Sequence, residues 1–313
     1  MIKIAAVVGP TASGKTALSV TLAEKFSGEI VSADSMQIYK GMDIATAKPT
    51  EEEKHGIIHH MMDFLSPDVR YSVSDYVKDA KKCISGIASR GKLPIIAGGT
   101  GLYVDSLITN TEFGEMPDNS KIRKELQSRL EKEGSSAILG ELMKIDPECA
   151  KTLHENNAGR VIRALEVYYL TGVTMTELKR RSHLTPSEYD ACIIGINYKN
   201  RDVLYSRIDK RVDMMVRGGL IDEAKRYADL CPDATSAQAI GYKELKPYFD
   251  GEITLECALD NLKRATRRYA KRQITWFKRN GNINWIYPDE DKNYTDTAEN
   301  IISEFLKKGG DNV

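Results

Sequence analysis

A short glycine-rich motif near the amino terminus constrains the fold of this chain more than any other feature. Residues 9–16 read GPTASGKT and match the pattern GxxxxGK[ST]; the apolar run Ile4–Val8 precedes them and the helical pattern Lys15–Phe26 follows. Such a loop between a buried strand and a helix binds phosphates through its backbone N–H groups and the helix amino terminus. The expected diphosphate ligands are Gly9, Pro10, Thr11, Ala12, Ser13, Gly14, Lys15 and Thr16, with Thr16 also expected to bind Mg²⁺.

Alternation of strand and helix continues through the first hundred residues. Glu29–Ala33 and Leu93–Ala97 read as further buried strands, and Val73–Arg90 between them reads as a helix. Apolar strands joined by helices form parallel sheets that are covered on both faces. The sequence therefore predicts an α/β fold, a P-loop NTPase-like parallel sheet flanked by helices.

The middle of the chain predicts a helical insertion in that core. Lys121–Glu133, Ala137–Ile145 and Arg160–Thr171 have helical spacing, and strand character returns at Ala191–Ile196. We expect residues 1–115 and 190–313 to form the core and residues 116–189 the insertion domain. The remaining predicted elements are the helices Arg201–Val216, Leu220–Leu230 and Thr254–Arg279, the strand Ile283–Tyr287, and a final helix ending near Lys308.

Composition excludes several classes of protein. Of the 313 residues, 45 are Lys or Arg and 45 are Asp or Glu, so a uniformly cationic surface is excluded and any basic patch is local. The five cysteines form no CxxC pair, which argues against a zinc site or a disulfide framework. No apolar run approaches the roughly 20 residues that span a bilayer, and the amino terminus lacks signal-peptide features. We expect a cytoplasmic protein that does not associate with membranes.

Polar residues follow the second and third strands directly. Asp34 ends the second strand, and the third ends in Gly98-Gly99-Thr100-Gly101. Residues beyond the carboxyl ends of parallel strands line the ligand crevice, so Asp34 is a candidate general base and Thr100 offers a hydroxyl there. Gln37 is suited to pair with an adenine edge. The alternatives are an Asx-turn at Asp34 and a simple helix-entry turn at Thr100.

Asp34 is also the only carboxylate at these strand ends. A P-loop NTPase normally uses such an acid to hold Mg²⁺ through water, so one acid must serve either metal or base chemistry. This weakens the interpretation as an NTPase.

A basic stretch over residues 260–280 is the candidate RNA-binding surface. It contains eight cations and one acid, Asp260, and Leu262, Ala265, Tyr269 and Trp276 share one narrow helical face. Cations gathered on one helix face of a neutral protein suit a phosphate backbone. A merely solvated helix face is the alternative. The cations are Lys263, Arg264, Arg267, Arg268, Lys271, Arg272, Lys278 and Arg279.

Several blocks together resemble one family, the tRNA dimethylallyltransferases, also called tRNA isopentenyltransferases. The blocks are residues 9–16, 34–49 (DSMQIYKGMDIATAKP), 98–103 (GGTGLY), 160–167 (RVIRALEV), 239–244 (AIGYKE) and 269–277 (YAKRQITWF). Their order is highly specific, and the resemblance covers about residues 4–287. Ala45 stands where the family usually has glycine, which affects local loop geometry. Absence of the zinc finger of eukaryotic relatives favours the bacterial type.

The resemblance implies a specific reaction. Dimethylallyl diphosphate, held with Mg²⁺, donates its prenyl group to N6 of the adenosine just 3′ of the anticodon (adenosine-37) in tRNAs reading codons that start with U. Asp34 matches the general base and Thr11 the hydroxyl near the bridging oxygen, and Arg207 and Arg211 are placed near the diphosphate. Residues matching tRNA contacts are Asp34, Ser35, Met36, Gln37, Thr100, Arg123, Arg160, Gly241, Lys243, Arg268, Lys271 and Arg272, with residues 156–160 and 239–244 around them.

The expected partner is thus the tRNA anticodon stem-loop, bound by a monomer whose insertion domain contacts the RNA. Three other functions remain open from sequence: a dimethylallyltransferase acting on a free adenine nucleotide, a P-loop small-molecule kinase that uses ATP, and a non-catalytic RNA-binding module.

Overall fold

The computed structural model describes residues 1–113, 120–182, 185–227 and 234–308. The chain forms two compact units, one from Met1–Ile108 with Ser187–Val313 and the other from Thr109–Pro186. The predicted boundary between residues 115 and 116 lies outside the described residues. The other predicted boundary, between residues 189 and 190, lies three residues after the end of the second unit at Pro186 and just inside strand β5 (Tyr189–Ile196). The charged Asp190 interrupts the apolar pattern and hides the start of this strand.

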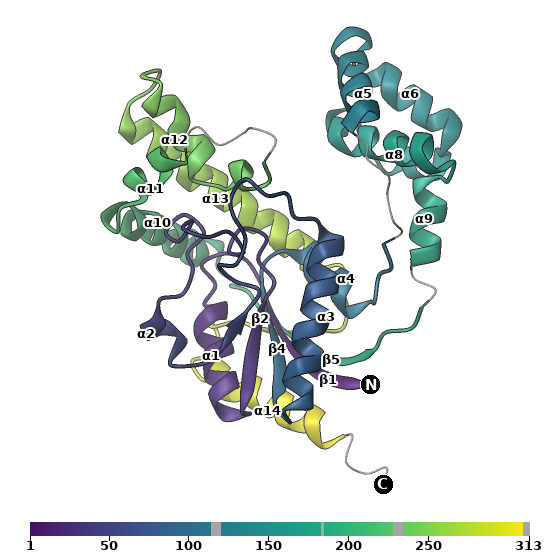
Figure 1. Cartoon of the computed structure of the whole chain (residues 1–313). Helices are drawn as coiled ribbons and strands as arrows, with labels where there is room; N and C mark the ends of the chain where they lie inside the picture. Colours follow the sequence, from purple (N-terminus) through teal and green to yellow (C-terminus); the bar gives the residue numbers. More distant parts are fainter. Residues whose placement is uncertain (114–119, 183–184, 228–233, 309–313) are drawn as a thin grey trace. The chain divides into compact units, whose positions relative to one another are not determined.

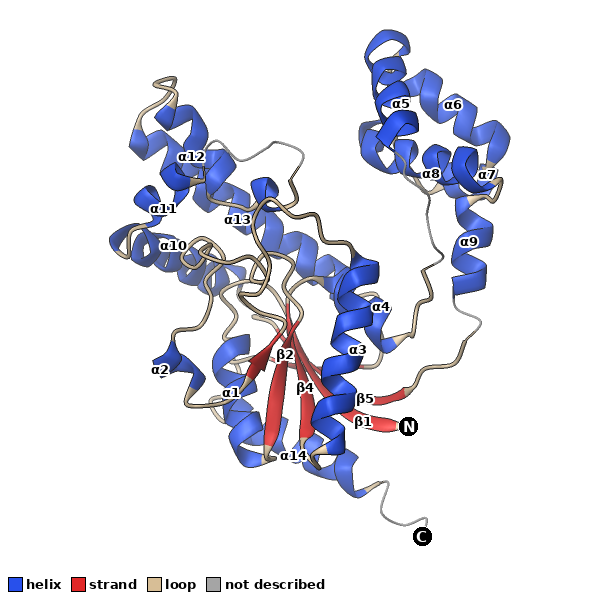
Figure 2. Cartoon of the chain, in the orientation of Figure 1, coloured by secondary structure: helices blue, strands red, loops and turns tan. Residues whose placement is uncertain are grey.

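A six-stranded sheet organises the first unit (Figure 2). Its strands lie in the order β3-β2-β4-β1-β5-β6, and every pairing is parallel, which confirms the predicted fold class. The two-residue strand β3 was not predicted, since so short a segment carries no periodicity. The other strands are β1 (Ile2–Val8), β2 (Gly28–Ser32), β3 (His59–His60), β4 (Leu93–Gly98) and β6 (Ile283–Ile286).

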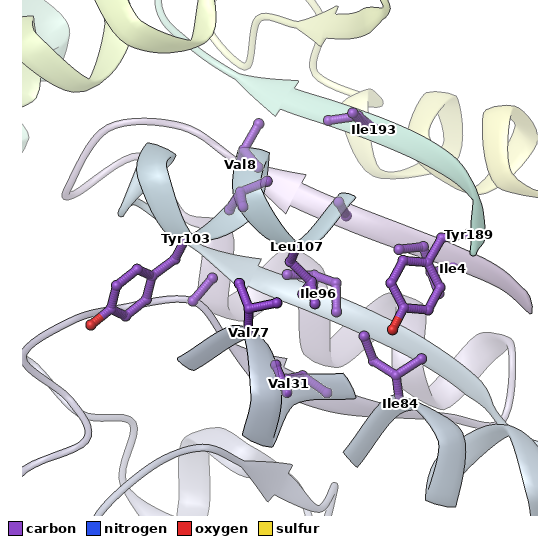
Figure 3. Close-up of a cluster of buried hydrophobic side chains, with 14 of the residues drawn as sticks. Ile4, Val8, Val31, Val77, Ile84, Ile96, Tyr103, Leu107, Tyr189 and Ile193 are labelled. Carbon is purple, nitrogen blue, oxygen red and sulfur yellow. The ribbon is translucent and has the colours of Figure 1, made fainter. Parts of the chain in front are cut away.

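Alternate residues of each strand supply two apolar layers, one on each face of the sheet. On one face Ile4 and Val8 of β1 pack with helices α3 (Val73–Ser89) and α4 (Gly101–Ile108), as Figure 3 shows for this cluster. On the other face Ala5 and Val7 pack with α1 (Lys15–Lys25) and α14 (Tyr294–Lys307). Burial on both faces fixes the strand register and holds the carboxyl ends of the strands at one edge.

Helices after β5 form a further apolar cluster with the segment that follows β2. Ile38, Tyr39 and Met42 from that segment are fully buried against these helices. The predicted helix Leu220–Leu230 ends at Arg226, and residues 228–230 lie outside the described part. The helices after β5, labelled in Figure 1, are α10 (Arg201–Arg217), α11 (Leu220–Arg226), α12 (Tyr242–Phe249) and α13 (Leu255–Phe277). A 3₁₀ turn, η2 (Ser236–Gln238), precedes α12, and the segment after β2 contains the short helix α2 (Glu51–Lys54).

The second unit contains helices and no strand among its described residues, as the sequence predicts. Leu126, Ile138 and Leu165 form its core, and the buried Asp146 accepts hydrogen bonds from Cys149 and Thr176. Its elements are α5 (Ser120–Glu133), α6 (Ser135–Ile145), α7 (Pro147–Lys151), η1 (Glu155–Asn157), α8 (Ala158–Thr171) and α9 (Met175–Ser182). No helix among the described residues of the chain is long and apolar enough to cross a membrane.

Candidate active site

The carboxyl ends of β1, β2 and β4 bring the predicted site residues together. Val8 of β1 lies opposite Gly98 of β4, and Ser32 of β2 lies opposite Ala97. Because the three strands are parallel neighbours, the loops that follow them open at the same edge. The phosphate loop, Asp34 and Thr100 therefore lie at one edge of the sheet, and their shared role in a ligand site stays a prediction.

The phosphate loop has the backbone that anion binding requires. Gly14 caps α1 in the left-handed conformation, with φ of 97°, a region that glycine reaches without steric cost. Ala12 also has positive φ, 61°, which is uncommon for a residue with a side chain and typical of functional loops. The first N–H groups of α1 have no intrahelical acceptor and can donate to a phosphate.

Three cations gather beside this loop. Lys15 Nζ donates to the carbonyl of Pro10 at 2.6 Å, and Arg207 Nε donates to the carbonyl of Ala12 at 2.9 Å. Burial and the charge of Arg211 lower the pKa of Lys15 to about 7, although Asp34 opposes them. Burial also lowers the pKa of Arg211. Arg207 thus contacts the phosphate loop, and Arg211 lies close enough to Lys15 to shift its pKa, so both arginines predicted near the diphosphate add positive charge at this loop.

Asp34 adopts the Asx-turn that was the structural alternative for this residue. Its Oδ1 accepts a hydrogen bond from the N–H of Met36 at 2.9 Å. The side chain is half-buried and close enough to Lys15 and Arg211 to shift the pKa of both. The turn and the predicted chemical role are compatible, because the turn fixes the carboxylate orientation through one oxygen.

The side chains of Thr100 and Gln37 both form hydrogen bonds with other residues of the protein. Thr100 Oγ1 accepts from the N–H of Ser35 at 3.0 Å, so its hydroxyl joins the loops after β2 and β4. Gln37 accepts from Ser32 at 3.2 Å and donates to the carbonyls of Thr46 and Ala47 at 3.2 and 3.1 Å. Its amide must exchange these partners to pair with a base, so its adenine contact stays a prediction.

Glu223 is a functional candidate that the sequence analysis missed. It is 1% exposed. Its carboxylate accepts from the N–H groups of residues 43, 44 and 45 at 2.8–2.9 Å and from the hydroxyl of Tyr242 at 3.0 Å. It thereby ties the segment after Asp34 to the start of α12, where Gly241 and Lys243 lie. Ala45 fits here without positive φ, so its departure from the family pattern strains no backbone.

Gln273 and Trp276 of α13 explain the glycines after β4. A Cβ atom at Gly99 would lie 2.1 Å from Gln273 Nε2, and one at Gly101 would lie 2.2 Å from Trp276. Only glycine allows α13 to approach this closely. The predicted apolar stripe of α13 is confirmed at Leu262, which is buried, but Ala265, Tyr269 and Trp276 are only half-buried. The buried face also includes Ala270, Gln273 and Phe277.

The basic face of α13 is partly neutralised by α10. Arg267 pairs with Asp209, and Lys263 pairs with Asp213 at 2.6 Å, so the predicted run of cations unrelieved by acids needs correction. The acids come from another helix and could not be seen in the local sequence. The remaining cations are exposed: Arg264, Arg268, Lys271, Arg272, Lys278 and Arg279. A shallow depression of about 210 Å³ is lined by Tyr205, Arg264, Arg267, Arg268 and Lys271.

Two predicted RNA contacts lie in the helical unit. Arg160 is exposed at the start of α8. Arg123 of α5 is also exposed and lies 3.8 Å from the buried Glu166, which accepts from Arg163 at 2.9 Å. Glu166 thus hydrogen-bonds Arg163 of α8 and lies within ion-pair distance of Arg123 of α5.

The residues at the phosphate loop fit a magnesium ion. The hydroxyl of Thr16 is exposed in the first turn of α1. The described residues contain no group of three His, Cys, Asp or Glu side chains that could hold a metal. Mg²⁺ commonly keeps several waters and binds through few protein ligands together with substrate phosphates. Thr16 with a bound diphosphate supplies that type of donor set.

Comparison with known proteins identifies the family. The protein-family model described as IPP transferase matches residues 37–280, and the family model described as isopentenyl transferase matches residues 2–63. A tRNA dimethylallyltransferase from Caldanaerobacter subterraneus subsp. tengcongensis is 47% identical over 97% of this chain and 98% of its own length. One from Halalkalibacterium halodurans is 50% identical over 91% and 90%. This chain belongs to the IPP transferase family.

Solved structures of IPP transferase relatives share the fold. A tRNA isopentenylpyrophosphate transferase from Bacillus halodurans has a TM-score of 0.74 and 45% identity, covering 98% of each chain. A eukaryotic dimethylallyltransferase, described as acting on tRNA, has a TM-score of 0.75 and 32% identity, covering 92% of this chain and 74% of its own. The family, the fold and the class of enzyme predicted from the sequence are confirmed.

Proposed function

We propose that this protein transfers the dimethylallyl group of dimethylallyl diphosphate to N6 of the adenosine just 3′ of the tRNA anticodon. One observation carries the proposal: the phosphate loop and Asp34 follow the carboxyl ends of β1 and β2 at one edge of the parallel sheet, and Asp34 lies close enough to Lys15 to shift its pKa. The loop suits a diphosphate leaving group, and the carboxylate suits an amine that must lose a proton. The names of the relatives support tRNA as the acceptor.

On the donor side, the protein stabilises a leaving diphosphate. An allylic diphosphate ionises readily because its carbocation is delocalised, and charge accumulates on the oxygens that depart. Lys15, Arg207 and Arg211 lie where that charge develops, which lowers the barrier more than uniform substrate binding does. Thr11 places a hydroxyl on the same loop, near the bridging oxygen. Mg²⁺ held through Thr16 would add positive charge on the diphosphate.

On the acceptor side, Asp34 activates a weak nucleophile. The N6 lone pair is delocalised into the adenine ring. A hydrogen bond from N6 to the Asp34 carboxylate localises that pair, and the carboxylate takes the proton as the carbon–nitrogen bond forms. The adenosine must leave the anticodon stack to reach this position, as in other enzymes that modify nucleobases.

The RNA contacts extend from the crevice onto two surfaces. The exposed cations Arg268, Lys271 and Arg272 of α13 bind tRNA phosphates, and Gly241 and Lys243 contact tRNA at the start of α12. In the helical unit Arg123 and Arg160 add contacts. We further propose a monomer in the cytoplasm that acts on tRNAs reading codons that begin with U.

A transfer assay tests this proposal against its rivals. Purified protein is incubated with Mg²⁺, labelled dimethylallyl diphosphate and either unmodified tRNA or AMP, and separately with labelled ATP. Label should enter tRNA at a single adenosine beside the anticodon, with release of diphosphate. Label in AMP supports a nucleotide prenyltransferase, and ADP formation supports a kinase. Either outcome without tRNA labelling contradicts the proposal.

A further inference from the structure

A buried side-chain amide connects the two halves of the site. Gln273 of α13 is 5% exposed. Its Oε1 accepts from the N–H of Thr11 in the phosphate loop at 2.8 Å, and its Nε2 donates to the carbonyl of Gly99 at 2.9 Å. These partners are 262 and 174 residues away in sequence. A single amide therefore holds the loop after β1 against the loop after β4.

The connection continues to Asp34. Thr100, next to Gly99, accepts the N–H of Ser35 through its hydroxyl at 3.0 Å, and the N–H of Thr100 donates to the carbonyl of Ala33 at 3.1 Å. Asp34 lies between Ala33 and Ser35, so Thr100 holds the residues on both sides of it. A hydrogen-bonded path thus runs from Thr11 through Gln273 and Thr100 to the backbone flanking Asp34.

Such a path controls the distance between the two reactants. Reacting atoms must approach to about 3–3.5 Å in alignment, and misplacement by about 1 Å can cost about 100-fold in rate. The phosphate loop fixes the donor, and Asp34 fixes the acceptor nitrogen. The amide is suited to this role because one end accepts and the other donates, which matches the N–H of Thr11 and the carbonyl of Gly99 in one orientation only.

We propose that Gln273 is a positioning residue for prenyl transfer, which sets the separation between the donor-holding loop at Thr11 and the acceptor-activating carboxylate of Asp34. This inference rests on the proposed function. Gln273 touches neither substrate and acts through its two backbone partners. The same helix carries the exposed cations Arg268, Lys271 and Arg272, so the element that binds tRNA also holds the geometry of the crevice.

The variant Gln273→Glu tests the inference with a pH-dependent readout. An ionised carboxylate still accepts from Thr11 but repels the carbonyl of Gly99. A protonated carboxyl restores the donor, and burial raises the pKa of such a group. Tyr269 contacts Gln273 and interacts with Asp34 and Arg272, and Asp34 in turn interacts with Lys15 and Arg211; the wild type contains all of these titratable groups. The pH profile of the variant divided by that of the wild type therefore isolates residue 273.

We expect Gln273→Glu to lower the single-turnover rate by about 100-fold at about pH 8, with both substrates saturating. The loss relative to wild type should shrink by at least about tenfold near pH 5.5, where the carboxyl becomes protonated. Dissociation constants for dimethylallyl diphosphate and tRNA should stay within about threefold of wild type. The matched control is Asn282→Asp, the same amide-to-acid change at an exposed residue before β6, at the opposite edge of the sheet.

Gln273→Met removes both hydrogen bonds without adding a charge and should lose rate equally at every pH. Urea unfolding followed by tryptophan fluorescence shows whether Gln273→Glu folds. If it does not, Gln273→Met provides the test in its place. A wild-type rate in either folded variant overturns the inference, as does a rate loss matched by weaker substrate binding. If the wild type itself fails to label tRNA, the proposed function fails instead, so the two failures are distinguishable.

Discussion

The buried carboxylate of Glu223 gives the most quantitative prediction for stability. In Glu223→Gln, the remaining oxygen can keep the N–H groups of Asp43 and Ile44, and the new NH₂ group can donate to the hydroxyl oxygen of Tyr242. The N–H of Ala45 then faces another donor and has no acceptor. An orphaned buried donor costs about 1–3 kcal/mol, and two bonds to a charged acceptor become weaker neutral ones.

We therefore expect Glu223→Gln to lower the free energy of unfolding of the first unit by about 3 kcal/mol. Tyr242→Phe leaves the three backbone bonds intact and should cost about 1 kcal/mol. Both tryptophans, Trp276 and Trp285, lie in the first unit, so urea unfolding followed by tryptophan fluorescence reports that unit alone. Glu256→Gln on the exposed first turn of α13 is the matched control. A Glu223→Gln loss below about 1 kcal/mol would show that the N–H of Ala45 is not left without an acceptor.

Three further predictions concern the site. Asp34→Asn should lower the single-turnover rate by about 100-fold while tRNA affinity stays near wild type; weaker binding with an unchanged rate contradicts the role of base. Because the pKa of Lys15 is lowered to about 7, the free protein loses this charge as pH rises, and a bound diphosphate restores it. Calorimetry should therefore show proton uptake on binding dimethylallyl diphosphate and an affinity that falls from about pH 7 to 9; a flat affinity rejects this. Replacing Arg268 or Lys271 by alanine should each reduce the slope of log binding constant against log salt concentration for tRNA by about one unit, whereas Lys78→Ala on α3 should not. Equal slopes for all three variants would contradict the assignment of α13 as a tRNA-binding surface.

The parts of the site that were predictable are those encoded in short segments. The phosphate loop needs only a strand, eight residues and a helix in succession, and the position of Asp34 follows from where a parallel strand ends. Both signals are local, since backbone geometry at a strand end depends little on the rest of the chain. Arg207 and Arg211 were placed by resemblance. The hydrogen bond of Arg207 to Ala12 and the electrostatic effect of Arg211 on Lys15 became visible only in the folded chain.

The parts that were missed depend on contacts between distant residues. Gln273 lies within a strongly basic stretch, where a polar residue reads as exposed, yet it is buried because Gly99 lets α13 approach. Glu223 reads as one of several charges on a surface helix. The pairing of Arg267 with Asp209 joins residues 58 apart on different helices. Hydrophobic periodicity along the sequence indicates which face of a helix is buried. It does not indicate which polar side chain on that face has a hydrogen-bond partner elsewhere in the fold.

The proposed reaction requires that the phosphate loop bind an allylic diphosphate beside the base. Isothermal titration of the protein with dimethylallyl diphosphate and, separately, with ATP, both with Mg²⁺, tests it most directly, with Lys15→Met as the reference. We expect saturable binding of the prenyl diphosphate that Lys15→Met weakens by at least about tenfold, and no turnover of ATP. Tight ATP binding with hydrolysis, and no heat from the prenyl diphosphate, would show that the loop serves a nucleotide instead.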